Sequence, residues 1–248
     1  MSLSSRSTKI FSMLFAGLLF VPVLANSADH PDFTGVWQAY GSDPRFGVGG
    51  ENALTQQGAA MVDAYFAQYG DDFAEPGSYC VPPGLAGTMT SMVSYPIEVL
   101  HSQDRVTILL EYDMQVRRIF MDGRTTPTDL PVTRMGYSLG HWEDDELVIE
   151  TSLLSEWLMR SWPRSENTTA VERVYRTTRE EAGVPATGFV QASDYDDVLV
   201  FELTVTDATL YKEPQTITMY YQKIPDDSFL EYDCPADLWR RALEGRSY

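Results

Sequence analysis

The stretch GYSLGHWEDDELVIET, residues 136–151, contains two runs of alternating side chains separated by Asp144-Asp145. A two-residue turn at the aspartates would place Trp142 opposite Leu147 and His141 opposite Val148. Alternation then sorts the side chains into two faces. One face carries Ser138, Gly140, Trp142, Leu147, Ile149 and Thr151, and the other carries Tyr137, Leu139, His141, Val148 and Glu150. The stretch therefore predicts an antiparallel β-hairpin.

The same stretch contains a Gly-x-Ser-x-Gly pattern, which is typical of the nucleophile elbow of serine hydrolases. That motif requires a sharp turn from a strand into a helix, and a histidine that follows both the serine and the acid. Here Ser138 is followed by strand-like sequence, and His141, only three residues later, is the last histidine of the chain. The pattern does not indicate a serine hydrolase.

Outward from this hairpin, period-two alternation continues from residue 95 and predicts further strands. They are expected at 105–113, 115–123, 137–143, 146–152, 170–178, 197–207, 215–224 and 229–234, with a first strand at 33–37. Because the connections have no room for crossover helices, we expect a mainly β, antiparallel, closed or nearly closed barrel of about eight to nine strands. Helical spacing predicts one helix at 56–70, N-capped by Thr55, and a short terminal helix at 235–245.

The N-terminus resembles a secretory signal peptide. Arg6 and Lys9 precede the apolar stretch 10–24, and Val23-Leu24-Ala25 offers a small-residue cleavage site. We expect residues 1–25 to be removed and residues 26–248 to form a single exported domain, periplasmic or secreted, with no membrane insertion. A retained anchor helix is the alternative.

The only two cysteines are Cys80 and Cys234. In an exported protein the simplest interpretation is a disulfide between them. A nucleophilic cysteine is the alternative, although neither residue lies in a recognisable motif.

Composition excludes several functions. The chain carries 36 acidic against 18 basic residues, a net charge of −18, which disfavours binding to nucleic acid or anionic lipid. The histidines lack metal-ligand spacing, and no phosphate-binding or dinucleotide-binding glycine motif occurs. We expect no metal and no cofactor; the sequence leaves the oligomeric state open.

Two groups of polar residues are candidates for chemistry. Tyr137, His141 and Glu150 share a hairpin face and could act as acid and base, unless that face is simply the exterior. Glu111 and Arg118 would share a face if the chain turns near Asp113-Met114. That pair could fix the polar end of a ligand or be purely structural.

Tryptophans suggest a pocket for a small hydrophobic or aromatic molecule. Trp37 lies in the first strand, Trp142 on the more apolar hairpin face, and Trp157 and Trp162 in the 153–170 loop. So many large apolar groups in a loop pack either on the barrel wall or on a ligand at its mouth.

Two resemblances accompany these patterns. FTGVW, residues 33–37, resembles the Gly-x-Trp opening strand of lipocalin-like (calycin) barrels, whose eight antiparallel strands surround a cavity for hydrophobic ligands. YPIEVL, EYDMQVRRIFMDGR, GYSLGHWEDDELVIET and VERVYR are similar to an exported bacterial family of largely unassigned function, over about residues 33–234 and including both cysteines. Members of that family commonly have His at Tyr137, Arg at His141 and a Gly-containing turn at 144–145, departures that bear on the role of His141 in particular. The family has no settled catalytic assignment, so the resemblance implies no residue roles.

Three hypotheses follow. The first is a lipocalin-like carrier whose pocket is lined by Trp37, Trp142, Trp157 and Trp162, with Arg118 and Glu111 at its polar end. The second is a cofactor-independent lyase or isomerase in which Tyr137, His141, Glu150 or Glu111 moves protons and Arg118 stabilises negative charge. The third is a structural or interaction module. The first two differ in which hairpin face must line the cavity.

Overall fold

The computed structural model describes residues 30–43, 53–69, 81–89, 95–157, 163–184, 193–233 and 237. Several predictions fall outside these ranges and are not addressed by the fold. They are the signal peptide at 1–25, the Cys80–Cys234 disulfide, the pocket residue Trp162 and all but one residue of the C-terminal helix.

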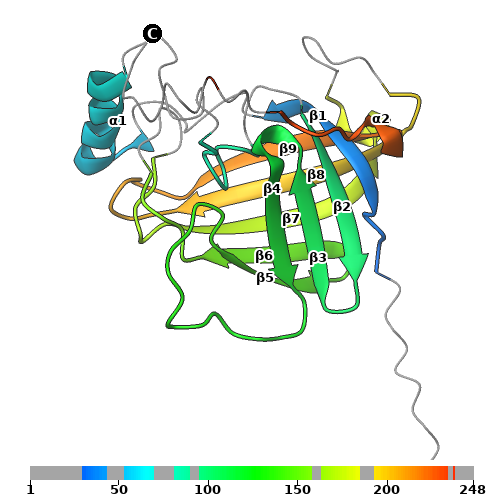
Figure 1. Ribbon diagram of the computed structural model, residues 1–248, viewed down its shortest axis with the longest axis horizontal. Helices are drawn as coiled ribbons and strands as arrows, with labels where there is room; N and C mark the ends of the chain where they lie inside the picture. The colour runs from blue at the N-terminus through cyan, green and yellow to red at the C-terminus, as the bar shows by residue number, and fades with distance from the viewer. Residues whose placement is uncertain are drawn as a thin grey trace, which may run out of the picture.

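Nine strands close into one barrel in which each strand lies beside its neighbours in sequence, and β9 pairs with β1 (Figure 1). The strands are β1 (Gly35–Asp43), β2 (Pro96–Ser102), β3 (Arg105–Leu110), β4 (Gln115–Phe120), β5 (Tyr137–Glu143), β6 (Glu146–Ser152), β7 (Thr169–Thr178), β8 (Asp197–Thr206) and β9 (Gln215–Ile224). The helical elements are α1 (Gln56–Tyr69), α2 (Arg179–Ala182) and the 3-10 turns η3 (Tyr112–Met114) and η4 (Asp226–Ser228). In Figure 1, β2, β3 and β4 run steeply across the direction of β5 to β9.

The predicted mainly β barrel with a helix on its N-terminal side is confirmed, but two strand predictions are wrong. Strand β2 was not predicted; it begins at Pro96, which a sheet tolerates only at a strand start or an edge. Conversely, residues 229–233 form no strand. Both sides of β9 are already occupied, since it pairs with β8 and with β1, so the segment that follows it cannot add as a strand beside it.

The prediction of a fully antiparallel sheet needs one correction. Eight of the nine pairings are antiparallel, whereas β4 and β5 are parallel and pair only at Ile119 with Ser138 and at Phe120 with Leu139. The connection 121–136 carries the chain back along the barrel before β5 begins. Residues 115–118 of β4 therefore pair with β3 on one side and not with β5 on the other.

Inward-facing side chains of the strands fill the barrel. Trp37, Ile119, Ile149 and Leu203 are each fully buried within one continuous apolar cluster. The segment 81–89 adds Leu85, Ala86 and Met89 to the same cluster. This segment thus occupies space that would otherwise open into the barrel interior.

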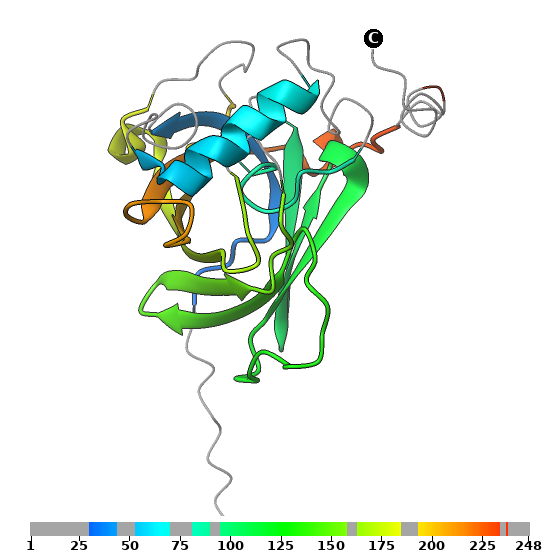
Figure 2. The same cartoon turned by 90° about the vertical axis from the view of Figure 1, so that its left-hand side faces the viewer.

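Helix α1 lies across one end of the barrel (Figure 2). As predicted, Thr55 caps it, since its hydroxyl accepts a hydrogen bond from the Gly58 amide at 3.1 Å. The Thr55 amide donates to the Leu210 carbonyl at 2.9 Å, and Tyr65 is buried on the inner side. Within the described ranges, neither helix has the length and apolar character needed to span a bilayer.

Candidate functional site

The 136–151 hairpin has the predicted register, with Trp142 opposite Leu147 and His141 opposite Val148 around the Asp144-Asp145 turn. The structure settles which face points inward. Ser138, Leu147, Ile149 and Thr151 are buried, whereas His141 and Glu150 are exposed. The Trp142 face therefore packs on the core and the His141 face is the outer surface.

The acid/base arrangement required by the lyase or isomerase hypothesis is absent from the barrel interior. The imidazole of His141 is 51% exposed and its Nε2 lies 3.2 Å from Oε1 of Glu143, not beside Glu150. Arg173 donates to Glu143 at 2.7 Å, and this bond, followed by the one from His141, lowers the pKa of Glu143. This cluster is a solvated surface network, so the geometry does not support His141 and Glu150 as catalytic groups.

Glu111 and Arg118 do not form the predicted pair. Glu111 is buried just before η3, where its carboxylate accepts a hydrogen bond from the Leu230 amide at 2.7 Å. Arg118 lies on the outer face of β4 and is exposed. Glu111 therefore anchors the chain after β9 rather than holding a ligand.

The inward arginine of β4 is Arg117, and its partner is Glu172 of β7. Its Nη1 donates to Glu172 Oε1 at 2.9 Å, and its Nη2 donates to Glu172 Oε2 and, at 3.0 Å, to Thr151 Oγ1. Its Nε reaches Ser138 Oγ at 3.3 Å, and the two hydroxyls lie 2.8 Å apart. A carboxylate within a strand is usually solvated, but the side chain of Glu172 is fully buried in this network.

This packing explains the Gly-x-Ser-x-Gly pattern. Ser138 is a buried hydrogen-bonding partner inside the barrel, not an exposed nucleophile. A Cβ on Gly140 would lie 2.7 Å from Ile119 Cγ2, and Gly136 has a φ of 68° with the Ser152 carbonyl 2.5 Å from where its Cβ would be. The glycines allow close approach of β4, β5 and β6, and the motif is structural.

Three of the tryptophans expected in a pocket, Trp37, Trp142 and Trp157, lie in the described ranges and pack against other side chains. Trp37 is fully buried and donates from Nε1 to the Phe33 carbonyl at 2.9 Å. Trp142 stacks on His30 with ring centroids 4.6 Å apart, and Trp157 lies under the guanidinium of Arg134 at 4.6 Å. Neither of the two pockets described next is lined by Trp37, Trp142 or Trp157.

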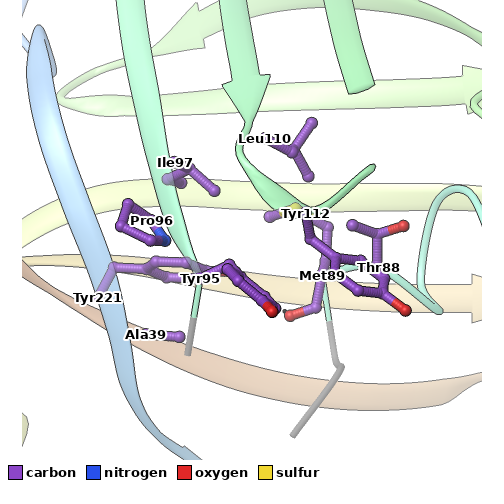
Figure 3. A pocket seen from close by; sticks show the side chains of 9 residues that line it. All are labelled: Ala39, Thr88, Met89, Tyr95, Pro96, Ile97, Leu110, Tyr112 and Tyr221. Carbon is purple, nitrogen blue, oxygen red and sulfur yellow. Dashed lines mark hydrogen bonds between the residues drawn. The ribbon is translucent and has the colours of Figure 1, made fainter. Parts of the chain in front are cut away.

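One pocket lies where segment 81–89 meets the barrel (Figure 3). Figure 3 shows its side chains converging from β1, β2, β3, β9 and the loops between them. Its volume is about 10 Å³, and the Tyr221 hydroxyl closes it by donating to the Met89 carbonyl at 3.2 Å. Such a volume admits about one water molecule, so this pocket does not accommodate an organic ligand in the observed conformation.

A larger pocket of about 320 Å³ lies where β4 and β5 separate, and we call it the β4–β5 pocket. The rings of Phe120 and Tyr137 stack here with centroids 5.1 Å apart and an interplanar angle of 26°. The pocket is lined by Val116, Arg117, Arg118, Phe120, Thr133, Met135, Gly136, Tyr137 and Ser138. Two predicted site residues, Arg118 and Tyr137, thus meet here, although not in the predicted combination.

The remaining residues of this pocket had no sequence signal. Val116, Phe120 and Met135 are apolar residues like many others in the chain, and they become a lining only because β4 and β5 diverge. In the described part of the chain, no group of three or more His, Cys, Asp or Glu side chains could hold a metal ion.

Comparisons with known proteins give fold-level likeness only. No protein-family model and no curated protein matches the chain. Among solved structures it is similar to apo lipid binding protein 8 of Caenorhabditis elegans, at 10% identity and a TM-score of 0.35, covering 77% of this chain and 95% of that one. It is also similar to human cRBP IV, at 12% identity and a TM-score of 0.32, covering 78% and 99% respectively. Neither likeness bears on what this chain binds.

Proposed function

We propose that this protein binds a small, largely apolar molecule with an aromatic ring, and that the ligand occupies the β4–β5 pocket. The observation that carries the proposal is the pocket itself, with a volume of about 320 Å³ beside the stacked rings of Phe120 and Tyr137. Pockets for small organic ligands usually begin at about 300 Å³ and are lined mainly by apolar and aromatic side chains with a few polar groups.

The exposure of the lining residues supports the same proposal. Val116 is 50% exposed on the outer face of β4. Apolar side chains left in water at a concave site gain free energy when a ligand covers them, by roughly 25 cal/mol per Å² of apolar surface. Side chains of a neighbouring strand would normally flank Val116, but β5 pairs with only the last two residues of β4.

Calorimetric titration with the neutral aromatic probe 2-naphthamide tests the proposal. Val116→Trp fills the pocket from an exposed position without touching the core, so we expect it to abolish binding. Val171→Trp is the matched control, because Val171 is 41% exposed on β7 and does not line the pocket. Both variants should retain the circular dichroism of the unmodified barrel.

The proposal fails if the unmodified protein does not bind the probe. It fails equally if Val116→Trp and Val171→Trp bind the probe as the unmodified protein does, because the ligand would then sit elsewhere.

Export and a disulfide belong to the same proposal and rest on the sequence alone. Expression of the full chain in a bacterium should yield a mature protein that begins at Asn26 and is recovered from the periplasm or medium. Its intact mass should rise by two hydrogen atoms on reduction if Cys80 and Cys234 are joined. A chain that keeps residues 1–25, or two free thiols in the native protein, would contradict these expectations.

A further inference from the structure

The charge of the β4–β5 pocket is opposite to that of the chain. The sequence has 36 acidic residues against 18 basic ones, yet the nine residues that line the pocket include two arginines and no acid. The charge of Arg117 is already matched by Glu172 inside the barrel. Arg118 is therefore the charge that this pocket presents to a ligand.

The guanidinium of Arg118 is available. It makes no hydrogen bond or ion pair with any residue that the structure describes. The residue paired with Arg118 on β3 is the uncharged Thr107. In contrast, Arg124, which follows β4, is held by Asp122 and lies 4.0 Å above the Phe120 ring. A free guanidinium presents a planar fork of N–H groups that matches a carboxylate.

The stacked rings of Phe120 and Tyr137 line the same pocket as the guanidinium of Arg118. Arg118 and Phe120 are two residues apart on the same face of β4, a separation of roughly 7 Å along the strand. Tyr137 stacks on Phe120 from the β5 side. A ligand whose ring contacts Phe120 and Tyr137 would place a substituent one or two bonds from that ring within reach of Arg118.

We propose that the ligand of the β4–β5 pocket is an aromatic carboxylate, and that Arg118 selects it by binding its carboxylate. This inference rests on the proposed function and specifies its ligand class. It makes Arg118 a specificity-determining residue, while Phe120, Tyr137 and Val116 provide affinity that does not depend on charge.

Three probes of matched shape test the inference: 2-naphthoate, 2-naphthamide and 2-naphthylmethylamine, titrated by calorimetry at pH 7. We expect the acid to bind about tenfold more tightly than the amide, since a bond to a charged group contributes more than a neutral one. The amine should bind most weakly. Arg118→Gln should reduce the affinity for 2-naphthoate about tenfold and leave the affinity for 2-naphthamide unchanged.

Arg176→Gln is the control for net charge. It removes one arginine from β7, where Arg176 pairs with Asp197, so it changes the charge of the chain by the same amount without altering the pocket. Its affinity for 2-naphthoate should stay close to that of the unmodified protein. Equal losses in Arg118→Gln and Arg176→Gln would show a general charge effect and overturn the role of Arg118.

The two proposals fail in different ways. Binding of all three probes with equal affinity, unaffected by Arg118→Gln, would overturn the carboxylate inference and leave the aromatic pocket standing. Failure of the unmodified protein to bind 2-naphthamide would overturn the pocket itself.

Discussion

Arg117 and Glu172 form a two-pronged ion pair inside the barrel, joining β4 to β7 with side chains that are 1% and 0% exposed. The Ser138 hydroxyl accepts a hydrogen bond from Nε of Arg117, and the Thr151 hydroxyl accepts one from Nη2. Strands β4 and β7 are not neighbours, and together with Ser138 of β5 and Thr151 of β6 this pair joins four consecutive strands on the inner side of the wall. A buried pair of this kind fixes one arrangement, because a partner left alone would be a desolvated charge.

Breaking the pair on one side should destabilise the fold strongly. Glu172→Gln leaves the Arg117 guanidinium buried without a counter-charge, so we expect the free energy of unfolding to fall by about 3–5 kcal/mol. The double change Arg117→Met with Glu172→Leu removes both charges and should recover most of that loss. Urea denaturation monitored by circular dichroism measures both; a double variant as unstable as Glu172→Gln would contradict this account.

Gly140→Ala should destabilise the crossing of β4 over β5. The added methyl group would lie 2.7 Å from Ile119 Cγ2 and 2.5 Å from Met121 Sδ, closer than packed carbon atoms tolerate. Overpacking of this kind costs typically 1–3 kcal/mol, which thermal denaturation resolves. Gly123→Asn is the control, because that position has open space and a φ of 72° that asparagine adopts readily. Equal melting temperatures for the two variants would contradict the packing role of Gly140.

Asp113 should make the protein less stable as pH rises. Both of its carboxylate oxygens are buried and lack a hydrogen-bond partner among the described residues, and burial raises its pKa from 3.8 to about 6. Between these two values the folded state holds a proton that the unfolded state has lost, so the stability contributed by the protonated acid disappears as pH rises through 6. Asp113→Asn removes the titration and suits the φ of 58° at this position.

We therefore expect Asp113→Asn to melt at a higher temperature than the unmodified protein at pH 7.5, with a smaller difference at pH 4. Melting curves at both pH values provide the measurement. A difference that does not change with pH would exclude Asp113 as the titrating group.

Arg164 should hold segment 81–89 in the barrel. Its buried guanidinium donates to the carbonyls of Leu85 at 2.6 Å, Pro83 at 2.9 Å and Arg134 at 3.2 Å. Burial lowers its pKa to about 10, so it remains charged at neutral pH. Arg164→Met leaves three carbonyls without this donor, at a cost of about 1–3 kcal/mol for each group that stays buried.

Hydrogen exchange measures that effect directly. The Leu85 amide, which donates to the Arg134 carbonyl, should exchange faster in Arg164→Met than in the unmodified protein. Arg173→Met, which removes an exposed ion pair on β7, should leave the exchange of Leu85 unchanged. Slow exchange of Leu85 in Arg164→Met would show that apolar packing alone retains the segment.

The barrel could be predicted because its evidence is local. Alternation and turn residues in 136–151 specify the hairpin register without reference to the rest of the chain, and the helix at 56–69 follows from its spacing and the Thr55 cap. The inner face of β4 was harder to predict, since QVRRIF carries one arginine and apolar residues on each face. Arg117 was therefore overlooked and Arg118 was assigned a partner that it does not have.

The candidate pocket could not be predicted for a different reason. It arises where two consecutive strands, joined by the 121–136 connection, run parallel and pair at only two residue pairs. No local pattern in either strand encodes that divergence. The burial of Glu172 has no local signal either, because a carboxylate in a strand is usually solvated and its partner Arg117 lies 55 residues away in sequence.

The short contact between β4 and β5 also has a mechanical consequence. A closed barrel resists deformation because each strand is paired on both sides. Here β4 and β5 are joined by two residue pairs, whereas β7 and β8 are joined by ten. The barrel wall should therefore deform most easily between β4 and β5. A ligand bound in the β4–β5 pocket would contact both strands and make the whole barrel more rigid. Binding should therefore slow the local opening of strands that the ligand does not contact.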